Sequence, residues 1–198
     1  MRVKPVSGVV LAGGLGTRLA GEDKGLIDIG SRPMIAHVIE RFAPQVTDLT
    51  INANRNVERY SAFGYPVVAD TLAEYPGPLA GIGAALAACR EQILACVPCD
   101  SPFLPTDLVD RLHEAMVREG SRVSYAVSGD QPQPVFALLH SDLLESLSDY
   151  VADGGRRIMS WYRQIDATPV DFGEDDSAFA NINTAADIAD AGRRLERP

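Results

Sequence analysis

The stretch GVVLAGGLGTRLAGEDKG, residues 8–25, decides the fold of this chain. Its apolar start, residues 9–11, runs directly into three glycines, a pattern that predicts a buried strand whose tip bends sharply into a phosphate-sized loop. Glycine suits such a tip because it accepts positive φ and, without a Cβ atom, lets backbone N–H groups close on an anion. Arg18 and Lys24 add positive charge, so the stretch predicts a loop that cradles a polyphosphate.

Two well-known glycine-loop motifs do not fit this stretch. The dinucleotide-binding motif Gly-x-Gly-x-x-Gly needs a third glycine for close packing of helix on strand, but residues 14–19 end in Leu19. A Walker loop needs lysine and then serine or threonine after its last glycine, but Gly21 is followed by Glu22 and Asp23. Three glycines are also compatible with a plain turn, so the phosphate interpretation needs support from the rest of the chain.

Length and charge restrict the class of protein. The 198 residues suit a single domain, residues 1–198, that buries roughly 70% of its unfolded surface. There are 27 Asp and Glu residues against 18 Lys and Arg, a net charge of −9 that opposes nonspecific binding to nucleic acid or anionic lipid. The longest other apolar run, residues 79–89, is shorter than the ~18 residues that a membrane span needs. Neither nucleic acid nor a membrane is expected as a partner.

The three cysteines, Cys89, Cys96 and Cys99, form an odd set, which argues against a disulfide-built secreted fold and favours a cytoplasmic location. The spacing of Cys96 and Cys99 is also found in redox and zinc sites, but there is no second pair and the histidines are scattered. On one strand, their odd separation would place the two side chains on opposite faces. We therefore interpret the thiols as small core residues.

Short β-like runs alternate with helix-like segments, which predicts an α/β fold with a mostly parallel central sheet covered by helices. The absence of an internal repeat or a flexible joint favours one continuous domain. The expected strands are residues 8–11, 49–52, 67–69, 93–97, 123–126 and 135–138. The expected helices are residues 33–41, 79–89, 105–118, 141–150, 156–162 and 185–195. Pro105 should lie in the first turn of its helix, and Thr184 with Asp187 should cap the last one.

Polar residues stand where three of the expected strands end. Asn52 closes one strand, Asp70 follows another, and Asp100 follows the apolar segment 93–99. Because ligands of open α/β sheets bind at the carboxyl ends of the strands, we expect these side chains beside the glycine loop. A carboxylate such as Asp100 suits Mg²⁺ shared with nucleotide phosphates, and the Asn52 amide can both donate to and accept from a base edge. Each residue alone is also typical of an ordinary turn or helix cap.

Two further segments carry candidate site residues. The segment YPGPLAGIG, residues 75–83, leads into a helix with small residues that permit either close approach of a ligand or tight packing on the sheet. Asn181 and Asn183 are two positions apart and can face one side of an extended segment. The acidic residues 174–176 are interpreted as a solvated loop without a site role.

Taken together, these segments closely resemble the bacterial molybdenum cofactor guanylyltransferase family from about residue 8 to about residue 190. The matching segments are LAGG at 11–14, Arg18, DKG at 23–25, NANR at 52–55, YPGPLAG at 75–81, CDSP at 99–102 and NINT at 181–184. The resemblance implies a single-domain, Rossmann-like nucleotidyltransferase fold with helices on both faces of the sheet. It also implies transfer of GMP from GTP to the terminal phosphate of molybdopterin, with release of pyrophosphate. One departure is RLAG at 18–21, where the family usually has Arg-Met-Gly-Gly.

The resemblance further implies which residues form the site. GTP binding is implied for Leu11, Ala12, Gly13, Gly14, Lys24, Asn52, Asp70, Gly77 and Asp100. Pterin binding is implied for Gly81, Arg157, Asn181 and Asn183, catalysis for Arg18, Lys24 and Asp100, and Mg²⁺ binding for Asp100. GTP and molybdopterin or Mo-molybdopterin are the implied small-molecule partners. Transient contacts with cofactor-delivering or molybdoenzyme-maturation proteins are compatible with this role.

Three alternatives share parts of the pattern. Residues 11–19 also look like the loop of sugar-1-phosphate nucleotidyltransferases, whose chains are typically longer. Molybdopterin cytidylyltransferase shares the chemistry, and residue chemistry alone does not separate guanine from cytosine. A non-catalytic nucleotide- or pterin-binding adaptor would keep the pocket without the reaction, but the joint presence of Arg18, Lys24 and Asp100 favours an enzyme.

Overall fold

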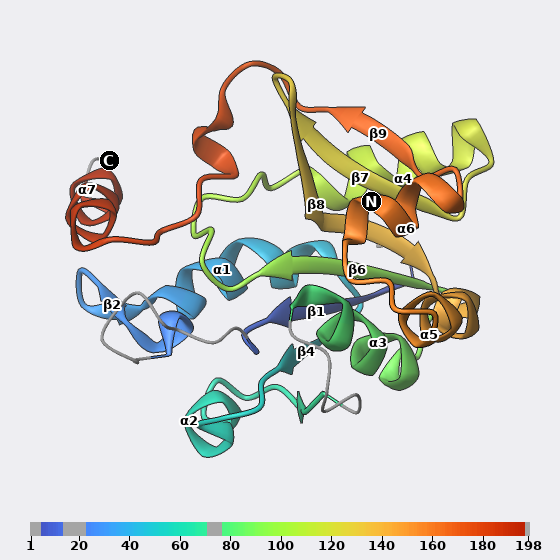
Figure 1. Cartoon of the computed structure of the whole chain (residues 1–198). Helices are drawn as coiled ribbons and strands as arrows, with labels where there is room; N and C mark the ends of the chain where they lie inside the picture. Colours follow the sequence, from blue (N-terminus) through green and yellow to red (C-terminus); the bar gives the residue numbers. More distant parts are fainter. Residues whose placement is uncertain (1–4, 14–22, 71–76, 197–198) are drawn as a thin grey trace.

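A computed structural model describes residues 5–13, 23–70 and 77–196 of the chain (Figure 1). Its central sheet has seven strands in the order β5-β4-β1-β6-β8-β7-β9. The strands are β1 (Val6–Leu11), β4 (Asp48–Asn52), β5 (Val67–Val68), β6 (Ile93–Pro98), β7 (Val123–Ser128), β8 (Gln131–His140) and β9 (Thr168–Asp171). Within this sheet the described strands run parallel except β8, which pairs antiparallel with β6 and β7. The predicted mostly parallel sheet is confirmed.

Strand β1 lies inside the sheet, between β4 and β6, and all but its last residue are buried. Valines such as Val6, Val9 and Val10 are typical of such a strand because helices cover both of its faces. Gly8 serves packing here: a Cβ atom at this position would lie 3.0 Å from side-chain atoms of Phe42, Val46 and Leu49. The buried strand predicted before the glycine loop is therefore present, and it begins two residues earlier than predicted.

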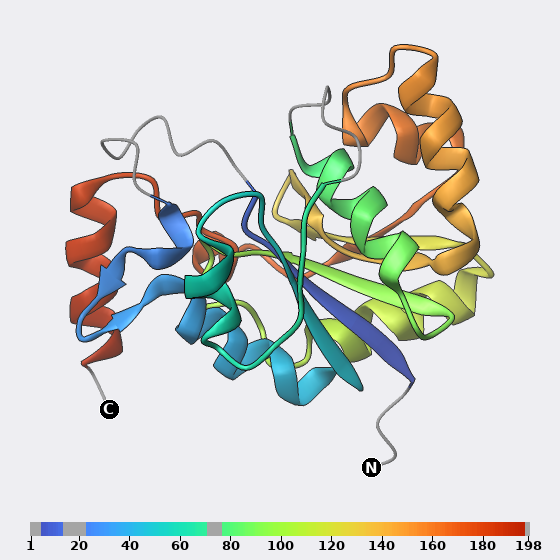
Figure 2. The same ribbon diagram turned by 90° about the horizontal axis from the view of Figure 1, so that it is seen from below.

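Helices cover both faces of the sheet, as Figure 1 and Figure 2 show. On one face, α1 (Met34–Phe42) and α4 (Leu108–Glu119) share a core with β1 and β4. On the other face, α3 (Pro78–Ala88), α5 (Leu144–Ala152) and α6 (Ile158–Gln164) enclose a second core around Trp161. This arrangement confirms the prediction of helices on both faces. No helix in the described ranges is long and apolar enough to cross a membrane.

The last helix, α7 (Ala185–Leu195), packs against a small hairpin of β2 (Asp28–Ile29) and β3 (Arg32–Pro33). Figure 2 shows this helix in red beside the blue hairpin. A third apolar cluster lies here and contains Ile29 of β2, Met34 at the start of α1, Ala191 of α7 and Ile182, which precedes α7. The C-terminal segment is thereby brought next to the segment that follows the glycine loop.

Several element predictions were wrong in detail. The helix expected from residue 105 begins at Leu108, with Asp107 as its N-cap, so Pro105 lies before the first turn. The strand expected at 135–138 is part of the longer β8, which forms a hairpin with β7 across Gly129. The helix expected from residue 141 starts with a 3-10 turn and becomes α-helical at Leu144. The pattern also missed β2, β3, β9 and the five-residue helix α2 (Val57–Ser61).

Candidate active site

The carboxyl ends of β4, β1 and β6 lie side by side, and the glycine loop begins between them. Leu11 pairs with Asn52 on one side and with the last residue of β6 on the other. Beyond the strands, the Ala12 N–H donates to the Asn52 carbonyl oxygen at 2.8 Å, and the Cys99 N–H donates to that of Leu11 at 3.1 Å. The strand tips thus meet at one edge, as predicted. Gly14 and Arg18 lie outside the described residues.

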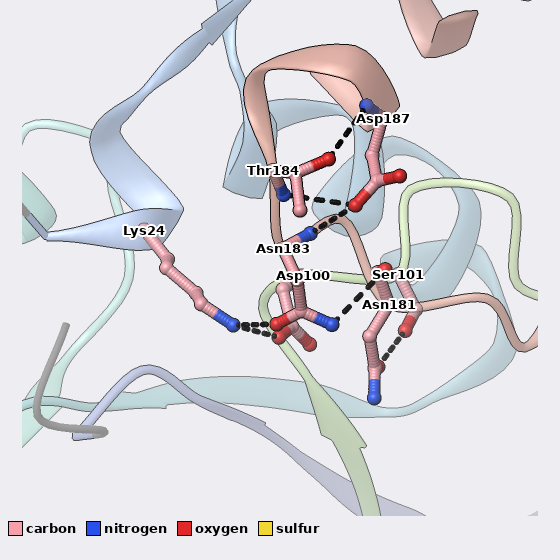
Figure 3. A network of polar contacts seen from close by, with 7 residues as sticks. All are labelled: Lys24, Asp100, Ser101, Asn181, Asn183, Thr184 and Asp187. Carbon is pink, nitrogen blue, oxygen red and sulfur yellow. Dashed lines mark hydrogen bonds and ion pairs between the residues drawn. The ribbon is translucent and has the colours of Figure 1, made fainter. Parts of the chain in front are cut away.

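Lys24, Asp100 and Asn183 meet at this edge although they are far apart in sequence (Figure 3). Lys24 Nζ donates to Asp100 Oδ2 at 3.0 Å and also to Asn183 Oδ1. The side chains of Lys24 and Asp100 are 23% and 15% exposed, so the ion pair is shielded yet open to a ligand. One ammonium group therefore links the segment after the glycine loop, the tip of β6 and the C-terminal segment.

The position of Lys24 depends on a buried carboxylate next to it. Asp23 is 7% exposed and accepts hydrogen bonds from Tyr60 Oη at 2.9 Å and from Asn56 Nδ2 at 3.0 Å. Gly25 completes the turn against the same tyrosine, since a Cβ atom there would lie 2.8 Å from Tyr60 Oη. Burial raises the pKa of Tyr60 far above its ordinary value, so the hydroxyl remains a donor. Sequence reasoning missed Tyr60, because a tyrosine in a short helix has no pattern that distinguishes this role.

The segment with the two predicted asparagines runs along the tip of β6. The Ile182 N–H donates to the Asp100 carbonyl oxygen at 2.9 Å, and Ser101 Oγ donates to Asn181 Oδ1 at 2.9 Å. Asn183 Nδ2 donates to the Asn181 carbonyl oxygen at 3.3 Å, which leaves Asn183 Oδ1 to accept from Lys24. The structure therefore brings both asparagines to the edge that carries Asp100.

A capping box fixes the start of α7 directly after these asparagines. Thr184 Oγ1 accepts from the Asp187 N–H at 3.1 Å, and Asp187 Oδ2 accepts from the Thr184 N–H at 2.8 Å, which confirms the predicted cap. The same Asp187 oxygen also accepts from the Asn183 N–H at 2.9 Å. This N–H lowers the pKa of Asp187 most, and Thr184 lowers it further. The bond to Asn183 was not predicted, because an ordinary capping box does not include it.

A second polar cluster lies at the tips of β4 and β5. Asn52 is 2% exposed, and its Nδ2 donates to Asp70 Oδ1 at 2.8 Å. Asn54 Nδ2 donates to Asp70 Oδ2 at 2.7 Å, and Asn54 Oδ1 accepts from the Asp70 N–H at 2.8 Å. Gly13 passes close by, since a Cβ atom there would lie 3.1 Å from Asn52 Oδ1 and 3.2 Å from Asn54 Nδ2. Asn54 is a further candidate that sequence reasoning quoted only as part of a motif.

The first turn of α3 rests on these strand tips. Gly77 is the N-cap and has φ +112°, a conformation that favours glycine. At Gly81, a Cβ atom would collide with Asn52 Oδ1 and lie 3.1 Å from the Leu11 side chain. The small residues of this segment therefore serve close packing on β1 and β4, and they border the groups that surround the glycine loop.

Arg157 is not joined to the other predicted site residues in the described part of the chain. It is the exposed N-cap of α6, and its carbonyl oxygen accepts from Tyr150 Oη at 2.9 Å. A surface hollow of about 590 Å³ is lined by Tyr150, Asp153 and Gly155, among others. No residue of the Lys24 cluster or the Asn52 cluster lines that hollow.

Asp100 has the donor chemistry for a magnesium ion that is shared with a ligand. Its Oδ2 accepts from Lys24, whereas among the described residues no hydrogen bond reaches Oδ1. Mg²⁺ typically binds one or two carboxylates and completes its shell with phosphate and water oxygens. No group of three His, Cys, Asp or Glu residues that could hold a metal occurs in residues 5–13, 23–70 and 77–196. A single carboxylate with one oxygen open to a ligand is compatible with this kind of Mg²⁺ binding.

The cysteine spacing does not mark a site. Cys96 is buried in the core beneath α3, whereas Cys99, just past the end of β6, is buried in the core beneath α1. Burial raises the pKa of both thiols, which keeps them protonated. The two side chains thus belong to opposite faces of the sheet, as the odd separation predicted.

The sequence matches known proteins over nearly its whole length. The MobA-like NTP transferase domain matches residues 8–168. A molybdenum cofactor guanylyltransferase from Shewanella putrefaciens is 42% identical over 179 residues, which cover 90% of this chain and 92% of that protein. One from Cupriavidus necator is 45% identical over 188 residues, which cover 92% of this chain and 94% of that protein.

The fold is shared with solved structures. Molybdopterin-guanine dinucleotide biosynthesis protein A from Archaeoglobus fulgidus has a TM-score of 0.78 at 22% identity, covering 97% of this chain and 100% of that chain. A CMP:2-keto-3-deoxy-manno-octonic acid synthetase, complexed with CTP, has a TM-score of 0.73 at 15% identity, covering 96% and 97%. At these identities the likeness concerns the fold alone. The family match and the sequence relatives go further: the chain belongs to the MobA-like NTP transferase domain family and, within it, to the molybdenum cofactor guanylyltransferases.

Proposed function

We propose that this chain transfers GMP from GTP to the terminal phosphate of molybdopterin, forming the guanine dinucleotide cofactor and releasing pyrophosphate. Relatives 41–45% identical over at least 90% of the chain carry the name molybdenum cofactor guanylyltransferase. The observation that carries the proposal is the bridge from Lys24 to Asp100 and Asn183, beside the start of the glycine loop. It provides one place where a triphosphate and a second phosphate can meet.

The proposed reaction is an in-line displacement at phosphorus. A phosphate oxygen of molybdopterin attacks the α-phosphorus of GTP, and the bond from this phosphorus to the bridging oxygen breaks. Pyrophosphate leaves with the electron pair of that bond, without a covalent enzyme intermediate. Because the attacking phosphate is already anionic, no protein group has to remove a proton, and positioning and charge neutralisation supply most of the catalysis.

Among the described residues, Lys24 is the one that we propose as the catalytic cation for this step. Its ammonium group already accommodates two acceptors, and it can exchange them for phosphate oxygens without moving its turn. Gly13 has no Cβ atom, so its backbone can lie close to a triphosphate as well as to the Asn52 and Asn54 side chains. Arg18 is proposed as the second cation on sequence grounds, together with loop amides such as that of Gly14. Such preorganised donors stabilise the charge that grows in the transition state.

Asp100 is the proposed ligand of Mg²⁺. When bound at Asp100, the ion would neutralise part of the phosphate charge. The ion pair with Lys24 orients the Asp100 carboxylate toward the edge of the sheet before any nucleotide arrives. Asp100 thus combines two proposed roles, as metal ligand and as partner of the catalytic cation.

The two substrates are proposed to approach from opposite sides of Asp100. Leu11, Ala12, Asn52, Asp70 and Gly77 surround the glycine-loop side, where we place GTP. The pterin is placed on the other side, along Asn181 and Asn183. Gly81 and Arg157 are assigned to it by resemblance alone, and Gly81 lies against Asn52 and Leu11 on the GTP side. This order follows the sheet, in which β4 and β1 precede β6 and the asparagine segment lies beyond the tip of β6.

The test is pyrophosphate release with GTP, CTP or dTTP, each with and without molybdopterin, in the presence of Mg²⁺. We expect release only with GTP and molybdopterin together. A preference for CTP would identify a cytidylyltransferase, and dTTP turnover with a sugar 1-phosphate would identify a sugar nucleotidyltransferase. Tight GTP binding without any release would indicate an adaptor. We further propose a cytoplasmic location, which the three free thiols support.

A further inference from the structure

We propose that Asp187 is a positioning residue, which holds Asn183 in the orientation that serves Lys24 and the second substrate. The inference rests on the proposed function for the kinetic part of its test. Asp187 itself lies in the first turn of α7 and touches neither Lys24 nor Asp100 through a hydrogen bond in the described ranges. Its hydrogen bonds therefore reach the site through the backbone of Asn183, and its charge also acts on Lys24.

The geometry around Asn183 is unusual for a helix start. Asp187 Oδ2 accepts from the Asn183 N–H at 2.9 Å and from the Thr184 N–H at 2.8 Å. A capping box by itself requires only the second of these bonds. The two peptide groups that flank the Asn183 Cα atom are thus tied to one oxygen, as Figure 3 shows. Fixing both peptides fixes the direction in which the Asn183 side chain leaves the backbone.

That direction determines the contact with Lys24. Asn183 Oδ1 accepts from Lys24 Nζ, which also donates to Asp100. The other end of the segment is held separately, because the Ile182 N–H donates to the Asp100 carbonyl oxygen at 2.9 Å. Without Asp187, the segment would keep the attachment at Ile182 but lose both attachments next to Asn183.

Helix α7, which carries Asp187, is held in place by apolar packing. Ala191 of this helix and Ile182 before it share a buried cluster with Ile29 of the hairpin and Met34 of α1, so the helix is packed on the segment that follows Lys24. The segment after Lys24 and the segment with Asn183 are therefore held together by this apolar cluster as well as by the Lys24–Asn183 hydrogen bond. Asp187 therefore couples the packing of α7 to the candidate active site.

Thr184 offers a matched control. Its hydroxyl caps α7 by accepting from the Asp187 N–H at 3.1 Å, and in the described residues that side chain has no hydrogen bond to Asn183. Thr184→Ala removes the cap but leaves both bonds from backbone N–H groups to the Asp187 carboxylate. Asp187→Ala keeps the bond from the backbone N–H of residue 187 to Thr184 Oγ1, but it removes both bonds to the Asn183 and Thr184 N–H groups. Asp187→Asn keeps a neutral acceptor and should rescue part of the effect.

The kinetic test measures kcat and the two KM values for wild type and for the three variants. For Asp187→Ala we expect the KM for molybdopterin to rise about tenfold, as for the loss of one charged hydrogen-bond partner, with less than a twofold change for GTP. Asp187→Asn should lie between this variant and wild type. Thr184→Ala should lower Tm and leave both KM values unchanged. Equal KM values for molybdopterin in Asp187→Ala and Thr184→Ala would overturn the proposal.

A second measurement does not depend on turnover. Hydrogen exchange at the Asn183 backbone amide, followed by NMR, should accelerate at least tenfold in Asp187→Ala and remain near wild type in Thr184→Ala. Unchanged exchange in Asp187→Ala would overturn the positioning role whatever the enzyme does. If the wild-type protein shows no pyrophosphate release but the exchange result holds, the proposed function fails while the positioning of Asn183 by Asp187 stands.

Discussion

Tyr60 Oη donates a 2.9 Å hydrogen bond to Asp23 Oδ1, and this buried contact anchors the turn that carries Lys24. Asn56 Nδ2 occupies the other carboxylate oxygen at 3.0 Å. A carboxylate with so little exposure is stable only when its oxygens are hydrogen-bonded. The short helix α2, which supplies Tyr60, therefore contributes to the candidate active site although it lies outside the strand tips.

Tyr60→Phe should lower the free energy of unfolding by about 1–3 kcal/mol, because it leaves one oxygen of Asp23 without its donor. Urea unfolding measures this loss. Tyr65→Phe is the matched control, since Tyr65 is half-buried and its hydroxyl makes no hydrogen bond within the described ranges. It should cost less than about 0.5 kcal/mol. Equal losses in the two variants would contradict the role of the Asp23 contact.

Lys24→Ala and Asp100→Ala should each slow turnover about 10²–10³-fold, the usual effect of losing one preorganised contact to a developing charge. Pyrophosphate release under saturating GTP and molybdopterin measures the rate. Arg118 and Glu119 form an exposed ion pair at 2.8 Å on α4 and provide control variants. Their replacement by alanine should leave the rate unchanged, because such surface pairs contribute little. Near wild-type rates for Lys24→Ala and Asp100→Ala would refute both assignments.

Most of the sheet could be predicted because its strands are apolar runs that end at glycine, proline or a polar residue. The missed strand β9 (Thr168–Asp171) contains Pro169 and lies at the edge of the sheet, where proline is tolerated. The missed helix α2 is only five residues long, too short to show a helical repeat of apolar residues. Both elements are defined by their neighbours in space, which a local pattern does not contain.

The strand-tip residues of the site were predictable for a geometric reason. Parallel strands end at one edge, so Asn52 and Asp100 had to lie near the glycine loop. The contacts that orient them were not predictable, because they join segments far apart in sequence. Asn54 binds Asp70 only because β5 pairs with β4, and Asp187 reaches Asn183 only because α7 starts where it does.

Gly81→Ala should lower the free energy of unfolding by about 1–3 kcal/mol and raise the KM for GTP. The new Cβ atom would collide with Asn52 Oδ1, and Asn52 is buried and bound to Asp70. Gly192→Ala in α7 is the control, since a Cβ atom there meets nothing within 4 Å. It should stabilise the protein by about 0.5–1 kcal/mol. A Gly81→Ala protein with wild-type stability and KM would show that α3 can move away from the strand tips.

Cys96 and Cys99 should not react with Ellman's reagent in the folded protein near neutral pH, because burial raises the pKa of both thiols. The half-buried Cys89, whose pKa burial also raises, should react slowly. After denaturation in the absence of reductant, all three thiols should react. Only one reactive thiol after denaturation would indicate a disulfide and would contradict the interpretation of the three cysteines as free thiols.

The stabilising effect of the Asp187 carboxylate should disappear in acid. Its pKa is lowered from the usual 3.8, chiefly by the Asn183 N–H. A carboxylate with a lower pKa in the folded than in the unfolded state stabilises the fold above its unfolded value and loses this effect as the pH falls through its folded value. The Tm difference between wild type and Asp187→Asn should therefore be largest near pH 6 and should shrink progressively below about pH 4.

Asp190→Asn provides the control for this titration. Asp190 lies on the same helix, but its side chain is 75% exposed and pairs with Arg193 at 3.0 Å. Its Tm difference from wild type should stay small at every pH, because an exposed ion pair contributes little. A gap for Asp187→Asn that persists unchanged to about pH 3 would mean that the loss of charge is not what weakens the start of α7. Because Asp and Asn have nearly the same shape, the gap would then reflect the amide group that Asp187→Asn places where a carboxylate oxygen stood.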